Sequence, residues 1–237
     1  GTKPIDDFER EARLLASRGH PGIPRFVGHF REGEGVHLRL YNVQQYVEGE
    51  SLEARVASRG VVPTEDARSL ARQLLQVLRY LHEREPAIVH RDVKPANVIV
   101  REDGRVSLVD FGIAREVRLG GTHGATMVGT LGYMSPEQMG GSATPQSDLY
   151  GVGATLLHAL AGRHPEELLS EGLQLRLEHV GLEPRLRAFL SRLVARRPKD
   201  RFGSAREALE ALEAWRAPSR PGVVVVAALA VVGIVAA

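Results

Sequence analysis

Cysteine is absent from the 237-residue sequence, which excludes disulfide bonds, thiolate zinc sites and cysteine nucleophiles. Lysine is also scarce, because only three of the 31 basic residues are lysines: Lys3, Lys94 and Lys199. The formal net charge is only +2, so bulk electrostatic attraction to nucleic acid is not expected. We therefore expect no nucleic-acid partner.

Charge is missing from the last segment, GVVVVAALAVVGIVAA, which runs from Gly222 to Ala237. A buried, valine-rich strand is one interpretation. The segment is longer than most strands, although it is shorter than the roughly 20 residues of a membrane-spanning helix. Arg216 and Arg220 precede it, as the excess of basic residues on the cytoplasmic side of membrane helices would require. We predict that residues 223–237 begin a transmembrane helix and that 217–222 form a juxtamembrane linker.

The rest of the chain has the composition of a folded domain, with 43% hydrophobic and 25% charged residues. Apolar residues at helical spacing predict helices at 4–19, 64–82, 147–162, 184–195 and 204–215. We expect Thr64 to cap the second of these, and Ser204 with Glu207 to form a capping box on the last.

Short strands are predicted in two places. The first pair lies within residues 23–47, around a turn at Gly33–Gly35, and a loop is expected at 47–52. The second pair is a hairpin, 97–100 with 105–110, turned at Asp103–Gly104. From Phe111 to Gly132 the chain is rich in Gly and Thr, so we expect a loop. The order predicts an α+β, two-lobed plan.

One segment concentrates the polar chemistry: VHRDVKPANVIVREDGRVSLVDFG, residues 89–112. It holds carboxylates, an amide and an amine between apolar runs, which suits metal, phosphate or proton chemistry. HRDVKPAN followed by DFG resembles the catalytic loop and metal-binding segment of eukaryotic-type protein kinases, with Val93 in place of the usual leucine. Lys94 two residues after Asp92, and Thr130 before SPE, fit the serine/threonine type rather than tyrosine kinases.

This resemblance extends from Phe8 to about Trp215 and implies roles for individual residues. Asp92 would orient the substrate hydroxyl and accept its proton, and Lys94 would stabilise the transferred phosphoryl group of ATP. Asn97 and Asp110 would bind Mg²⁺, with Mn²⁺ as a second candidate.

Further positions match the family in order. Glu11 matches the helix glutamate of the nucleotide site, Gln45 and Val47 the hinge that binds adenine, and Ile99 the floor beneath it. The resemblance assigns the remaining positions as follows: Glu137 at the end of the activation segment, paired with Arg201; His90, Arg91 and Asp148 as structural supports of the catalytic loop; Thr122 and Thr126 as autophosphorylation sites, or simple loop threonines.

The family also needs a glycine-rich loop and a strand lysine, and neither is found in this sequence. Lys3 is only eight positions before Glu11, beside Pro4, so it does not suit the lysine's role. We therefore predict an N-terminally truncated kinase domain over 1–216, with a partial, incomplete N-lobe (1–48) and a mainly helical C-lobe (49–216). Alone, this chain should be poorly soluble and show little or no activity.

The expected whole protein is a single-pass kinase of the bacterial inner (plasma) membrane with a cytoplasmic catalytic domain. Its expected partners are ATP, a protein substrate with Ser or Thr, the membrane, and a second copy of the chain during autophosphorylation. The alternative is a truncated, membrane-tethered docking module without catalysis. A small-molecule phosphotransferase is disfavoured because the segment GTLGYMSPE, residues 129–137, shapes a peptide-binding surface in the family.

Overall fold

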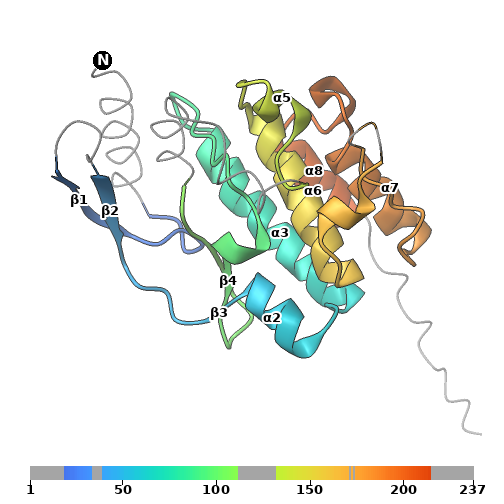
Figure 1. The fold of residues 1–237 in the computed structure, drawn as a ribbon, viewed down its shortest axis with the longest axis horizontal. Coiled ribbons are helices and arrows are strands. Elements are labelled where there is room, and N and C mark those ends of the chain that lie inside the picture. Colours follow the sequence, from blue (N-terminus) through green and yellow to red (C-terminus); the bar gives the residue numbers. More distant parts are fainter. Residues whose placement is uncertain (1–18, 34–38, 112–131, 171, 173, 215–237) are drawn as a thin grey trace, which may run out of the picture.

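The computed structural model describes residues 19–33, 39–111, 132–170, 172 and 174–214. β1 (Phe26–Glu32) and β2 (Arg39–Gln44) pair antiparallel, which confirms the predicted first pair of strands. Figure 1 shows these two strands on one side of the molecule and the long helices on the other. The predicted α+β architecture, with few strands and a mainly helical larger part, is confirmed.

A second sheet contains the predicted hairpin. β4 (Val98–Val100) and β5 (Val106–Leu108) pair antiparallel, and β3 (Glu50–Ser51) adds to the other edge of β4. The turn between β4 and β5 places Gly104 at φ 77°, a conformation that glycine adopts without steric cost. The predicted hairpin with its turn at Asp103–Gly104 is therefore confirmed.

The prediction of a loop at residues 47–52 is wrong for residues 50–52. Residues 50 and 51 form β3, and α2 (Leu52–Arg59) begins directly afterwards. The Oγ of Ser51 accepts a hydrogen bond from the Ala54 N–H at 3.1 Å and so caps this helix. Leu52 and Val56 are buried one turn apart. β3 depends on pairing with β4, nearly fifty residues away, which a local pattern does not reveal.

The larger part consists of α3 (Thr64–His82), α6 (Pro145–Ala161), α7 (Pro184–Leu193) and α8 (Ala205–Ala214), and it confirms four predicted helices. α3 packs against both α6 and α8. Leu74 and Leu78 of α3 and Leu149 of α6 are completely buried in the core between them. Each such leucine stabilises the fold by roughly 1.5–3 kcal/mol relative to an exposed one.

Two predicted helix caps differ in detail. Pro63, not Thr64, precedes the first turn of α3, and its carbonyl accepts the N–H of Ala67. At α8 the Ser204 Oγ accepts the Glu207 N–H as predicted, at 3.1 Å, but the Glu207 carboxylate reaches back to the N–H of Gly203 instead of Ser204.

Three predicted segments lie outside the described residues: the helix at 4–18, most of the loop between 111 and 132, and the apolar tail with its linker at 217–237. Within the part of the chain that the structure describes, no helix has both the length and the apolar character needed to cross a bilayer.

Candidate active site

Asp148, in the first turn of α6, anchors the backbone of the loop that leads to Asp92. Its side chain is only 1% exposed. Its carboxylate accepts three hydrogen bonds of 2.8 Å, from the backbone N–H groups of His90 and Arg91 and from Nε2 of His82. A buried carboxylate with three donors is well compensated, so this loop is fixed to the most buried helix of the molecule.

His90 lies at the centre of the loop and is completely buried. Its Nδ1 accepts the N–H of Asp92 at 3.3 Å, which leaves the proton on Nε2 to donate to the carbonyl of Val109 at 3.1 Å. Its ring packs against Phe111, with ring centroids 4.5 Å apart. Burial lowers the pKa of His90 below 6.5, so the ring is neutral at pH 7.

Asp92 is also the point where two other predicted site residues meet. The Nζ of Lys94 lies 3.0 Å from Asp92 Oδ2. The amide nitrogen of Asn97 donates to the same oxygen at 2.9 Å and to the Asp92 carbonyl at 2.8 Å. Asp92 and Asn97 are buried, and the Lys94 side chain is 19% exposed. The ammonium group of Lys94 and the side-chain amide of Asn97 together fix the orientation of the Asp92 carboxylate.

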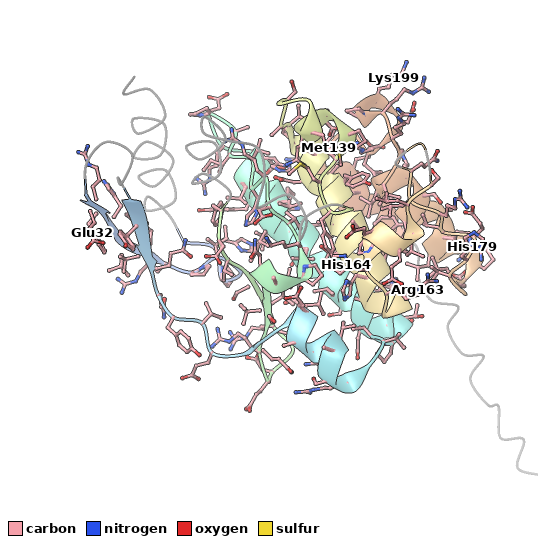
Figure 2. All side chains as sticks on the ribbon, viewed as in Figure 1. Glu32, Met139, Arg163, His164, His179 and Lys199 are labelled. Carbon is pink, nitrogen blue, oxygen red and sulfur yellow. The ribbon has the colours of Figure 1, made fainter. Side chains whose placement is uncertain are left out.

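The three lysines differ in position. Lys94 is in this cluster, Lys3 lies outside the described residues, and Lys199 belongs to the short helix η4 (Pro198–Asp200). Figure 2 shows Lys199 pointing away from the body of the molecule. Of the two described lysines, only Lys94 therefore lies beside Asp92 and Asn97.

The hairpin brings Asp110 back to the position where Asn97 begins it. Asn97 ends the short helix η2 (Pro95–Asn97), directly before β4, and its carbonyl accepts the N–H of Val109 at 2.9 Å. Asp110 follows Val109 at φ 56°, so the backbone turns sharply there, and its side chain is exposed. Burial lowers the pKa of His90, and the carboxylates of Asp92 and Asp110 act in the opposite direction and raise it.

This arrangement fits a magnesium ion bound together with a phosphate ligand. Both hydrogen bonds of the Asn97 side chain use its nitrogen, and its amide oxygen is the atom suited to coordinate a metal. The Asp110 carboxylate supplies a second hard oxygen. Among the described residues there is no cluster of three His, Asp or Glu side chains for a metal. Magnesium does not require one, because it keeps waters and phosphate oxygens as ligands.

The predicted adenine-binding positions lie on β4 and on the segment after β2. The backbone N–H of Gln45 donates to the carbonyl of Arg25 at 2.8 Å, so it is not available to a ligand. Gln45, Val47 and Ser107 help to line a cavity of about 310 Å³. Ile99 lies at the middle of β4, opposite Ser107 of β5.

Glu137 and Arg201 form a buried, bidentate ion pair, with N–O distances of 2.6 and 2.9 Å. The Arg201 side chain is 0% exposed, and Glu137 also accepts the hydroxyl of Ser147 at 2.7 Å. Burial alone would raise the pKa of Glu137, but the hydrogen bonds from Arg201 and Ser147 outweigh it and lower the pKa to about 2. The pair fixes α5 (Pro136–Met139) to the helical body.

The segment that ends in α5 runs along α6. The hydroxyl of Tyr133 lies 2.6 Å from Nδ1 of His158, near the C-terminal end of α6, whereas Glu137 bonds to Ser147 near its N-terminal end. In Figure 2, Met139 at the end of α5 and His164 beyond the far end of α6 are correspondingly well separated. Residues 132–139 thus form one side of the region around Asp92.

Sequence reasoning missed three polar residues that organise the site. His82 bonds to Asp148, and Gln138 of α5 bonds to the carbonyl of Arg91 at 2.9 Å. Gln73 of α3 holds the hairpin by donating to the carbonyl of Gly104 and accepting the N–H of Val106. The only signal was their polarity beside buried positions, which does not name a partner.

Four predicted site residues lie outside the described residues: Glu11, Thr122, Thr126 and Thr130. Their proposed roles remain predictions.

Comparison with known families identifies the chain's relatives. The model of the protein kinase domain family matches residues 2–212. Serine/threonine-protein kinase PknA of Nostoc sp. is 36% identical over 217 residues, which cover 86% of this chain and 37% of that protein. PrkC of Bacillus subtilis is 34% identical over 181 residues, covering 76% of this chain and 27% of that protein. The chain therefore spans well under half the length of these relatives.

Solved structures agree with the sequence comparison. The kinase domain of Mycobacterium tuberculosis PknI is similar, with a TM-score of 0.68 and 29% identity. The match covers 90% of this chain and 80% of that domain.

Proposed function

The chain belongs to the protein kinase family, as a serine/threonine protein kinase domain of bacterial type, and we propose that it catalyses transfer of the γ-phosphoryl group of ATP to protein hydroxyls. The observation that carries this proposal is the convergence of Lys94 and Asn97 on one carboxylate oxygen of Asp92. An ion pair or a helix cap would explain each residue singly. It would not explain why all three meet at the start of a hairpin whose other strand leads to Asp110.

In the proposed reaction the serine or threonine oxygen bonds to the γ-phosphorus, and the bond from that phosphorus to the β–γ bridging oxygen breaks, which releases ADP. Asp92 orients the attacking hydroxyl and accepts its proton. Lys94, which already lies 3.0 Å from Asp92, offsets negative charge on the phosphoryl group near the attacking oxygen. The fixed orientation of both groups lowers the cost of assembling the transition state.

Asn97 and Asp110 are the residues that would hold magnesium, and Mn²⁺ suits the same oxygen donors. The bound metal would neutralise charge on the phosphate oxygens of ATP. The hairpin between the two residues keeps their spacing constant, because β4 and β5 are paired and Gln73 fixes their turn to α3.

We further propose that the uncharged run from Gly222 to Ala237 anchors the protein in the bacterial plasma membrane, with the kinase domain in the cytoplasm. The length and apolar character of the run and the arginines before it support this. Membrane fractions from cells expressing the full-length protein should contain it. Recovery of the intact protein in the soluble fraction would contradict the anchor.

The catalytic proposal is tested by Asp92→Asn in the full-length protein, assayed with Mg-ATP and a generic protein substrate. Loss of the base should reduce phosphate transfer by about 10²-fold or more while the unfolding temperature stays close to that of wild type. Asp103→Asn is the matched control, because Asp103 is an exposed turn residue bonded to Arg105. Equal activity of the wild type, Asp92→Asn and Asp103→Asn would show that Asp92 is not the base. If none of the three proteins transfers phosphate, the result would favour the docking module.

A further inference from the structure

The backbone of Arg91, the residue directly before Asp92, is held in an unusual conformation. Arg91 has φ 69°, in the left-handed region that residues other than glycine rarely adopt. Such a conformation persists only where neighbouring groups determine it. The residue that follows is the proposed base, so any relaxation of Arg91 would turn the Asp92 side chain away from its present direction.

Three hydrogen bonds hold this part of the loop. Asp148 accepts the N–H of Arg91 at 2.8 Å, and His90 accepts the N–H of Asp92 at 3.3 Å. The third bond comes from another segment: Nε2 of Gln138 donates to the carbonyl of Arg91 at 2.9 Å. The carbonyl and the N–H of the Arg91–Asp92 peptide are therefore both engaged, and Gln138 holds its carbonyl side.

The other end of the Gln138 amide is also engaged. Its Oε1 accepts the backbone N–H of Ser135 at 3.2 Å and the Ser135 hydroxyl at 3.0 Å. Ser135 is completely buried, and the adjacent Glu137 is fixed by its ion pair with Arg201. The Gln138 side chain of α5 thus joins Ser135 to the Arg91–Asp92 peptide, which precedes the side chain of the proposed base.

We propose that Gln138 is a positioning residue for catalysis: it holds the backbone of Arg91 in its strained conformation and links the Arg91–Asp92 peptide to α5. This inference rests on the proposed function, because it concerns how the base is oriented. The role requires an amide, which donates to one partner and accepts from the other. A carboxylate of the same size accepts only, and would place an oxygen against the Arg91 carbonyl.

The test compares Gln138→Glu with Gln146→Glu in the full-length protein. Gln146 is a matched control, since its amide also donates to a backbone carbonyl, that of Gly203 at 3.1 Å, away from the catalytic loop. Gln138→Met, which keeps the length without charge, is a second variant. Turnover is expressed per nucleotide-binding site, so that unfolded molecules do not count. Hydrogen exchange of the peptide spanning Val89–Val93 is measured in parallel.

Both Gln138 variants should lower kcat by about tenfold relative to Gln146→Glu, with the KM for ATP within about twofold. The Val89–Val93 amides should exchange faster in both Gln138 variants and remain unchanged in Gln146→Glu. Values of kcat and exchange equal to those of the control would overturn the positioning role. Loss of nucleotide sites in both variants would overturn it too, by making Gln138 a determinant of folding.

The failure of the proposed function and the failure of the Gln138 proposal are distinguished by different measurements. A wild-type protein that binds nucleotide but transfers no phosphate contradicts the proposed function, whichever way the variants behave. The exchange measurement does not depend on activity, so it still decides whether Gln138 holds the loop.

Discussion

At the scale of single residues, the Glu137–Arg201 ion pair is important for stability because its guanidinium is buried. Arg201 is 0% exposed and donates to both carboxylate oxygens of Glu137, as well as to the carbonyls of Ala195, Gln146 and Arg196. A charge buried this deeply is costly when its partner is removed. The pair therefore contributes to the fold mainly by compensating a guanidinium that water cannot reach.

Replacing Glu137 with Gln should lower the free energy of unfolding at pH 7 by roughly 3–5 kcal/mol, because Arg201 remains buried and charged. The pKa of Glu137 is lowered in the folded state from 4.5 to about 2. Its contribution to stability is therefore complete above pH 4.5 and is lost as pH falls towards 2. Urea unfolding across this range should show a steeper loss in the wild type than in the variant.

Asp200→Asn provides the comparison, because Asp200 pairs with Arg197 at the exposed surface. It should change stability little at any pH. A Glu137→Gln protein that is as stable as Asp200→Asn at pH 7 would contradict the structural importance of the buried pair.

The candidate site was predictable from the sequence where side chains follow a fixed spacing. Asp92, Lys94, Asn97 and Asp110 were identified by the resemblance of HRDVKPAN and DFG to the motifs of protein kinases, and the structure brings the first three into contact. Gln138 was not, because its role depends on a carbonyl 47 positions earlier in the chain. A hydrogen bond from a side chain to a distant backbone atom leaves no trace in local sequence patterns.

At the scale of secondary-structure elements, α6 holds the loop that carries Asp92, and two glycines of α6 let neighbouring segments approach it closely. A Cβ atom at Gly151 would lie 2.9 Å from the carbonyl oxygen of Val93, the residue after Asp92. At Gly153 it would lie 2.5 Å from Val194 Cγ1 and 2.8 Å from Leu193 Cβ, at the end of α7. Both positions are crowded, Gly153 the more so, and they face different neighbours.

Gly151→Ala and Gly153→Ala should each destabilise the fold by about 1–3 kcal/mol through overpacking. Only Gly151→Ala should also lower kcat per folded molecule, because it displaces backbone that is bonded directly to Asp92. Thermal unfolding and steady-state kinetics on both variants separate the two effects. Equal kcat values for the two proteins would show that α6 does not set the position of the base.

Helices, strands and turns were predicted correctly where they depend on residues close together in the sequence. The amphipathic pattern of α3 and the Asp103–Gly104 turn depend on neighbouring residues, and both were predicted correctly. β3 and the whole of α2 (Leu52–Arg59) were missed. A two-residue strand exists only through its pairing with β4, and α2 buries only Leu52 and Val56, which is too short an apolar pattern to indicate a helix.

At the scale of the whole molecule, the loop that carries Asp92 leads directly into the β4–β5 hairpin, and α5, from a later part of the chain, packs beside that loop. Figure 1 shows the hairpin between the β1–β2 sheet and the helical body. The described contacts fix this region from three sides: Gln73 of α3 holds the hairpin, Asp148 of α6 the loop, and Arg201 holds α5. The division into lobes at residues 48 and 49 remains a prediction.

The most direct test of the account is a crystal structure of the full-length protein with a non-hydrolysable ATP analogue and Mn²⁺, in which anomalous scattering locates the metal. We expect the metal within about 2.0–2.3 Å of the Asn97 amide oxygen and an Asp110 carboxylate oxygen, with the γ-phosphate facing Asp92 and Lys94. A metal-nucleotide complex bound elsewhere, or one that contacts neither Asn97 nor Asp110, would contradict the proposed phosphoryl-transfer site.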